Sequence, residues 1–201
     1  MHRKALLLAS IAVLPLSGRA QSYLGLGATL LTNAPFATYS SPNLYDVSLS
    51  GGVQLTSRTA LQLEVGYGGR TTSSTYLNYG SGITSSEARI RNLLIPLQLR
   101  YTFTNPEKPL RLDGLAGFTV LRSTRHFTST YTNSSQTYEN ESSFTQYCAS
   151  LGPSIRYVLT PQVELFTAAV VNMTLNDSYN SFRDRLFLSA ELGAHYTFAR
   201  R

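Results

Sequence analysis

Eight segments of the chain alternate apolar and polar residues with a period of two, and this repeated pattern limits the fold more than any other feature of the sequence. In "NLLIPLQLRYTF", which runs from Asn92 to Phe103, every second residue from Leu93 onward is apolar. Such alternation is typical of a β-strand with one apolar and one polar face. The segments span residues 22–31, 44–55, 60–69, 89–103, 110–121, 145–159, 163–175 and 185–198. No stretch after residue 21 has a convincing helical period, so the sequence predicts an all-β fold.

The connections between these segments alternate between short and long. They are short after the second, fourth and sixth segments, where they read "TSRT", "TNPEKP" and "TPQ". They are long and polar after the first, third, fifth and seventh segments. With an even number of strands, both chain ends lie on the side of the short turns. This layout is typical of bacterial outer-membrane barrels, which have short periplasmic turns and long extracellular loops.

The size of the apolar face decides which way it points. It carries more than 30 Leu, Val, Ile, Tyr and Phe residues, whereas the interior of a closed eight-stranded barrel is only just wide enough for side chains. The apolar face must therefore point outward into lipid. We predict a closed, antiparallel, up-and-down, eight-stranded transmembrane β-barrel over residues 22–198. The alternative is a soluble periplasmic lipocalin-like carrier, which would place Leu93, Ile95, Leu97 and Leu99 inside.

The N-terminus has the pattern of a cleaved secretory signal peptide. A basic start with Arg3 and Lys4 precedes an apolar run over residues 5–16 and a small-residue exit at residues 18–20. This run is shorter than the ~20 apolar residues that a spanning helix needs. We expect residues 1–20 to be removed, which leaves one barrel domain, residues 21–201.

Charge and cysteine content exclude several classes of protein. Three of the 17 basic residues lie in the expected signal peptide, so 14 remain against 11 acidic residues. A net charge of +3 spread along the chain is not a nucleic-acid footprint. The single cysteine, Cys148, excludes a disulfide within one chain. The sequence has no spacing typical of metal ligands, and we expect no cofactor.

Aromatic residues of the apolar face gather near the two ends of the predicted strands. Such positions match the two interfacial girdles of a membrane barrel. The predicted girdle residues are Tyr101, Phe103, Tyr157, Tyr196 and Phe198 near the short turns, and Tyr45, Tyr67 and Tyr147 near the long loops.

Eight ionisable residues fall on the opposite face, which points into the predicted lumen. They are Glu64, Arg100, Arg111, Asp113, Arg156, Glu164, Glu191 and His195. An unpaired buried charge costs several kcal/mol, so we expect the arginines and carboxylates of this set to pair with one another. The set could line a gated ion path or fill the lumen as a structural plug. Eight strands leave no open channel, which favours the plug.

Two prolines interrupt predicted strands. Pro96 lies on the inward face of the fourth segment, and Pro153 lies on the outward face of the sixth. Proline cannot donate a ladder hydrogen bond, and a closed barrel has no edge strand to hold it. We expect a local break in the ladder at Pro96, with a β-bulge or a lumen water beside it.

Support for catalysis is thin. His126 lies in the longest connection and could act with Asp177, Asp184 or Glu139 at the outer rim, as in an outer-membrane acyltransferase or hydrolase. No spacing motif supports such a site, and a solvated loop histidine is the simpler interpretation. The sequence therefore predicts that the protein is not an enzyme.

The longest connection also contains "FTSTYTNSSQTYENESSF", residues 127–144. Tyrosine supplies amphipathic contact area, and serine and asparagine supply adaptable hydrogen bonds, as in binding loops. This composition fits adhesion or the binding of an unknown extracellular ligand. It also fits hairpin extensions that are merely solvated, because loop composition alone is only a correlation.

The fourth segment carries a resemblance to a known family. "NLLIPLQLRYTF", with Ile95-Pro96-Leu97 followed by Leu99, Arg100 and Tyr101, resembles a strand of small outer-membrane β-barrel proteins of the Bacteroidota, the PorT-like barrel family. "ASLGPSIRY" and "ELGAHYTF" are similar to other strands of that family, and the likeness covers residues 22–198. The resemblance implies an eight-stranded barrel in the outer membrane and implies little about activity.

The predicted partners follow from this placement. They are outer-membrane lipid and the barrel-insertion machinery, which reads the C-terminal strand. Such strands often end on an aromatic residue, whereas Phe198 is followed here by Ala-Arg-Arg. The expected role is structural or surface-binding.

Overall fold

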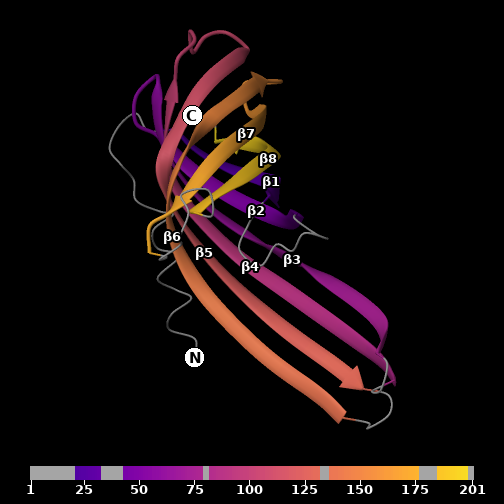
Figure 1. Cartoon of the computed structure of the whole chain (residues 1–201). Helices are drawn as coiled ribbons and strands as arrows, with labels where there is room; N and C mark the ends of the chain where they lie inside the picture. Colours follow the sequence, from indigo (N-terminus) through magenta and orange to yellow (C-terminus); the bar gives the residue numbers. More distant parts are fainter. Residues whose placement is uncertain (1–20, 33–42, 79–81, 132–135, 177–184, 199–201) are drawn as a thin grey trace, which may run out of the picture.

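Eight strands pair into a closed ring (Figure 1). The computed structural model describes residues 21–32, 43–78, 82–131, 136–176 and 185–198. The strands are β1 (Ser22–Thr32), β2 (Asn43–Gln54), β3 (Thr59–Asn78), β4 (Gly82–Thr102), β5 (Leu110–Tyr131), β6 (Gln136–Val158), β7 (Val163–Thr174) and β8 (Leu186–Thr197). Each pairs antiparallel with its neighbours in the sequence, and β8 pairs with β1, so the predicted fold class is confirmed. In the described part of the chain, no helix is long and apolar enough to span a membrane.

The register of the pairing fixes the shape of the barrel. Stepping from Ser22 to its partner on β2, then to that residue's partner on β3, and so on around the barrel, leads to Leu188 on β8. Leu188 lies opposite Thr32 of β1. We call such a set of opposed residues a pairing row. One circuit therefore returns to β1 ten residues further along. Such a stagger tilts the strands, typically by ~35–45° from the barrel axis. Because the offset is even, inward and outward residues stay in separate series around the whole ring.

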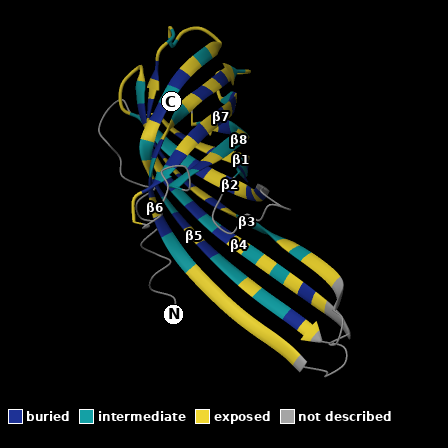
Figure 2. Cartoon of the chain, in the orientation of Figure 1, coloured by how far each residue is buried: buried dark blue, intermediate teal, exposed yellow. Residues whose placement is uncertain are grey.

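The outward face is apolar and the inward face is mostly polar. Figure 2 shows buried and exposed residues alternating along the barrel strands, most regularly along β7. Leu26, Leu151 and Leu192 are 66%, 67% and 66% exposed, and many other large apolar side chains share this face. Burying such a surface in lipid is strongly favourable. Leu97 and Leu99 also point outward. The lipocalin-like alternative, which would place them inside the barrel, is therefore wrong for these residues.

All eight residues predicted for the aromatic girdles are exposed on the outward face. The rings of Tyr101 and Phe103 meet edge to face at 5.4 Å, and those of Tyr196 and Phe198 do so at 5.5 Å. Tyr147 and Tyr157 lie ten residues apart on β6. At ~3.4 Å per residue and a tilt of ~40°, that separation is about 26 Å of height. It matches the ~25 Å apolar band of outer-membrane barrels.

Four neighbouring strands are much longer than the sequence pattern predicts. β3 to β6 have 20, 21, 22 and 23 residues, whereas the other four have 11 or 12. Residues 70–78, 82–88, 122–131 and 136–144, which the sequence assigned to loops, continue the ladder as two hairpins. Their Thr and Tyr residues are good strand formers, but both faces are mostly polar and give no alternating signal. We call this extension the projecting sheet (Figure 1).

The two prolines interrupt the ladder without shifting its register. Pairing between β3 and β4 stops after Leu63 and resumes at Gly66 in the same register, so the gap lies opposite Pro96. Pairing between β6 and β7 has a matching gap at Pro153. The expected bulge at Pro96 is therefore wrong, because a bulge would have added a residue to one strand. A cavity of about 20 Å³ adjoins Pro96, and one water needs ~10–15 Å³.

Replacing Leu192 by Arg tests whether the outward face meets lipid. Leu192 lies near mid-height on β8, so Leu192→Arg should lower the free energy of unfolding in lipid vesicles by about 2–4 kcal/mol. Leu175→Arg is the control: the same change at an exposed leucine just past the end of β7 should cost ~0–1 kcal/mol. Denaturant titration measures both. Equal and small losses would show that water, not lipid, covers Leu192.

Candidate functional site

The lumen holds a buried ionic network near the short turns, centred on Arg156. The Arg156 guanidinium donates to Asp113 through Nε at 2.5 Å and Nη2 at 3.0 Å. Its Nη1 donates to both oxygens of Glu164, at 2.9 and 3.0 Å. Thr102 completes the group by donating its hydroxyl to Asp113 at 2.6 Å. The side chains of Arg156 and Asp113 are 4% and 0% exposed, so water is excluded from this pair.

Register explains why these charges meet. Arg156 lies on β6 between β5 and β7, and the inward series brings Asp113 and Glu164 to either side of it. Arg111 reaches Glu164 at 3.7 Å, and Glu164 also contacts Nδ1 of His195 at 3.2 Å. A planar guanidinium can satisfy two carboxylates at once because its donors form a fixed fork.

An aromatic stack continues the network across the lumen. The His195 ring lies parallel to Phe166 at 4.1 Å and tilted against Tyr23 at 4.6 Å. The Arg100 guanidinium lies over the Tyr23 ring, 4.9 Å from its centroid, which is a cation–π contact. A side chain at Gly25 would overlap the His195 ring, so only glycine leaves room for it.

The predicted pairing among the eight lumen charges is only partly correct. Arg156 and Arg111 pair with carboxylates as expected. Arg100 lies on Tyr23 instead of a carboxylate, and among the described residues it forms no ion pair within 4 Å. Glu64 and Glu191 lie at mid-lumen, away from the arginines, where Ser48 donates to Glu191 at 2.9 Å. Neutral hydrogen bonds surround them, such as that between Thr119 and Ser150 at 2.6 Å.

A buried apolar layer lies in the lumen on the side of the projecting sheet, and the sequence did not predict it. Six inward residues from six strands form one buried cluster: Leu31, Leu44, Leu94, Leu121, Cys148 and Phe187. Each is at most 3% exposed. The strand register places all six at nearly the same height along the barrel axis, within about the rise from one strand to the next. The sequence did carry a signal for this layer. On several strands the otherwise polar inward face has an apolar residue near the long-loop end, such as Leu94, two positions from Pro96, and Phe187, two positions from Ser189.

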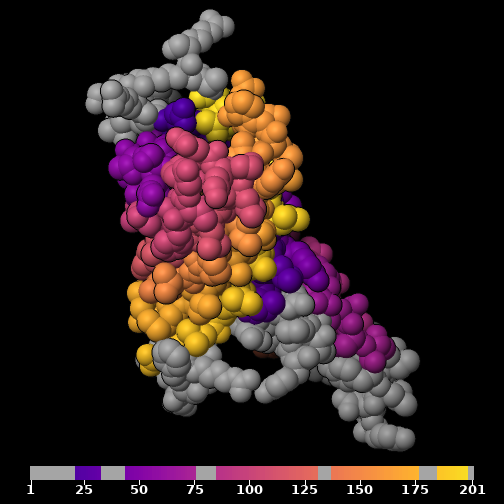
Figure 3. Space-filling view, turned by 90° about the horizontal axis from the view of Figure 1, so that it is seen from above, coloured from indigo at the N-terminus to yellow at the C-terminus, as the bar shows by residue number. Residues whose placement is uncertain are grey.

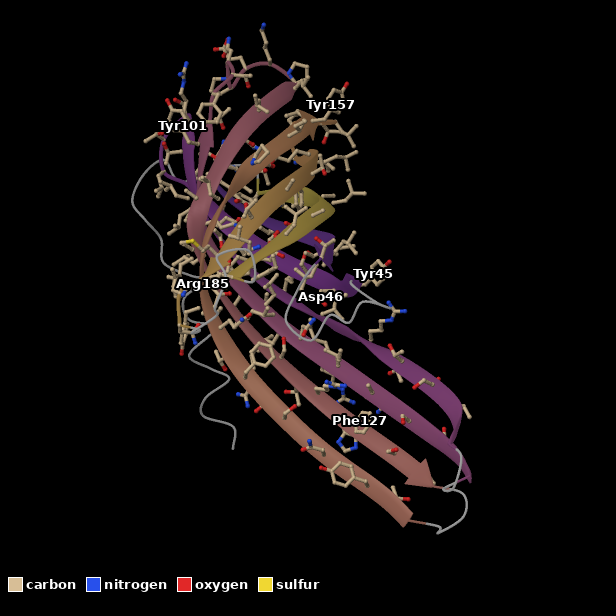
Figure 4. The ribbon with its side chains drawn as sticks, in the orientation of Figure 1. Tyr45, Asp46, Tyr101, Phe127, Tyr157 and Arg185 are labelled. Carbon is tan, nitrogen blue, oxygen red and sulfur yellow. The ribbon has the colours of Figure 1, made fainter. Side chains whose placement is uncertain are left out.

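A recess on the projecting sheet is the second candidate site. Arg125, Phe127, Tyr138, Asn140 and Ser142 line an open hollow of about 270 Å³ on the face continuous with the lumen. The Arg125 guanidinium lies 5.6 Å from the centre of the Phe127 ring. Figure 4 shows Phe127 midway along the projecting strands, and Figure 3 shows this part extending to one side of the barrel body. Sequence reasoning singled out residues 127–144 without separating their two faces.

His126 points to the opposite face of this sheet. It is exposed and lies between Arg89 on β4 and Glu141 on β6 in the strand register. Glu139, its proposed partner, lies on the same face opposite Thr128, which makes it a diagonal neighbour of His126. Asp177 and Asp184 lie outside the described residues.

Strand number, stagger and the outward apolar band define a small transmembrane β-barrel. The chain belongs to the outer membrane protein beta-barrel domain family, which matches residues 5–198. A major outer membrane protein from Thermus thermophilus has the same fold, with a TM-score of 0.63 and 16% identity over 90% of this chain and all of that chain. Ail, the attachment invasion locus protein of Yersinia pestis, aligns with a TM-score of 0.52 and 10% identity over 89% and 97% of the two chains.

No curated protein sequence matches this chain. The solved structures are too distant in sequence to show more than the fold. The family places the protein in the outer membrane, and the narrower resemblance to PorT-like proteins of the Bacteroidota stays a prediction.

Removing the charge of Arg156 tests the lumen network. Arg156→Met leaves Asp113 and Glu164 buried without their main partner, so it should lower the free energy of unfolding by about 3–5 kcal/mol. Glu87→Gln is the control, because it breaks the exposed pair with Arg89 and should change stability by about 0.5 kcal/mol or less. Unfolding in vesicles measures both. Equal stabilities for the two variants would contradict a central role of Arg156.

Proposed function

We propose that this protein binds an extracellular ligand through the projecting sheet and that its barrel is a non-conducting anchor in the outer membrane. Short turns and both termini face the periplasm, and the projecting sheet faces the exterior. The observation that carries the proposal is the unequal strand length: among the residues that the structure describes, only those of β3 to β6 extend beyond the barrel, and they carry the recess.

The projecting sheet is suited to recognition because its backbone is already ordered. Residues 122–131 pair with 136–145 without a gap, so the recess lies on a hydrogen-bonded ladder. A pre-ordered surface loses less conformational entropy on binding than a flexible loop. The sheet extends about ten residues beyond the girdle, a reach of ~25 Å at ~3.4 Å per residue and a tilt of ~40°.

The lining of the recess indicates the kind of ligand. Phe127 and Tyr138 offer ring faces for the apolar faces of sugars, while Arg125 and Asn140 offer hydrogen bonds to hydroxyl, carboxylate or sulfate groups. Aromatic walls with a few polar groups are typical of small-ligand sites. We therefore assign glycans as the ligand class and assign no catalytic role to His126.

A non-conducting lumen follows from two barriers in series. The apolar layer of six residues closes one end, and a hydrophobic constriction excludes water and ions. The Arg156 network fills the other end with paired charges. The two barriers support a lumen without a continuous wet path, in which the charges serve the structure of the barrel.

Removing the two rings of the recess tests the proposal. Detergent-solubilised protein is applied to an array of neutral, carboxylated and sulfated glycans. The wild type should bind a subset, and Phe127→Ala/Tyr138→Ala should weaken that binding at least ~10-fold, as expected for central aromatic contacts.

The matched control is Thr128→Ala/Glu139→Ala, an opposed pair next to the recess residues but on the other face of the sheet. It should bind as the wild type does. Absence of glycan binding by the wild type, or equal losses in the two variants, would refute the recess as the binding site.

A further inference from the structure

Two arginines lie on the outward face of the barrel just beyond the girdle on the side of the projecting sheet. Arg122 on β5 lies opposite Leu93 on β4, and Arg91 lies two residues beyond Leu93. Leu93 in turn lies opposite Tyr67, a residue of that girdle. Arg91 and Arg122 are therefore diagonal neighbours, ~7–8 Å apart at the backbone. Both are exposed.

Stagger brings these two arginines to a common height. Each pairing row climbs toward the projecting side from β1 to β8, because one circuit gains ten residues. At a tilt of ~40°, with strands ~4.8 Å apart, the climb is ~3 Å per strand. Arg122 gains this height over Leu93 by being one strand further along, and Arg91 gains ~5 Å by being two residues further out. Both guanidinium groups thus lie at the boundary of the apolar band.

Neither arginine has a carboxylate partner among the described residues. Acidic residues on this face begin further out: Glu141 lies opposite His126, and Glu87 pairs with Arg89 at 3.5 Å. The outward face of the projecting sheet is therefore basic where it leaves the membrane and acidic only beyond that level.

We propose that Arg91 and Arg122 bind the phosphate group of an outer-leaflet glycolipid. Arginine presents a planar fork of donors that matches phosphate oxygens. Two such forks at one height can converge on a single headgroup, while the acyl chains of the same lipid lie along Leu93 and Val120. A free phosphate ion would gain the charge contacts but not this apolar surface. The lipid is thus the favoured source of the anion.

Lipid A titration tests this site. The full-length mature protein in a nonionic maltoside detergent is titrated with bisphosphorylated lipid A in mixed micelles and followed by thermophoresis. Arg91→Gln/Arg122→Gln should bind roughly 10- to 30-fold more weakly than the wild type, from the attraction expected of two cations near a phosphate layer. Dephosphorylated lipid A should bind the wild type and this variant equally weakly.

The matched control is Arg58→Gln/Lys108→Gln, which removes two positive charges from exposed short turns at the other end of the barrel. It should bind lipid A like the wild type. A heat-dependent shift in gel mobility shows that each variant is folded. Equal losses in the two double variants would overturn the site. Full displacement of the lipid by millimolar inorganic phosphate would overturn the assignment to lipid.

Discussion

Every backbone N–H and C=O in the lipid core needs a partner within the protein, and the rest of this structure follows from that requirement. Open sheet edges are excluded, so β8 must pair with β1, and the ten-residue stagger of the ring sets the narrow lumen. The gaps opposite Pro96 and Pro153 are short local exceptions. Both gaps keep the register, because a slip of one residue would turn a whole strand's apolar face inward.

The narrow lumen in turn decides which inward residues are possible. An apolar layer lies on the side of the projecting sheet, Glu64 and Glu191 lie at mid-lumen among neutral hydrogen bonds, and the Arg156 network lies on the side of the short turns. Replacing a buried ion pair by apolar residues is often neutral or stabilising. The loss expected for Arg156→Met therefore measures the cost of leaving two buried carboxylates without their main partner, not the net stability that the network adds. The function proposed for the protein lies outside the lumen, on the projecting sheet.

The sequence predicted the features that depend on the alternation of apolar and polar residues. It did not predict the features of segments that show no such alternation. Strand number, closure and the outward direction of Leu97 and Leu99 were predictable, since only lipid accommodates so large an apolar face. The length of β3 to β6 was not, because residues 122–131 and 136–144 are polar on both faces. The cation–π contact of Arg100 with Tyr23 depends on neighbours brought together by the stagger, which no single strand encodes. The apolar layer could not be found from single strands, because each of its six strands contributes only one residue to it.

Planar-bilayer recording of the purified wild-type protein tests the central claim most directly, namely that this closed barrel has a filled lumen and acts at its outer surface. Because of the apolar layer and the Arg156 network, we expect the protein to insert without stable, resolvable single-channel current steps at moderate voltage and salt. Large, stable steps that scale with salt concentration would contradict the account, because they require a continuous water-filled path past both barriers.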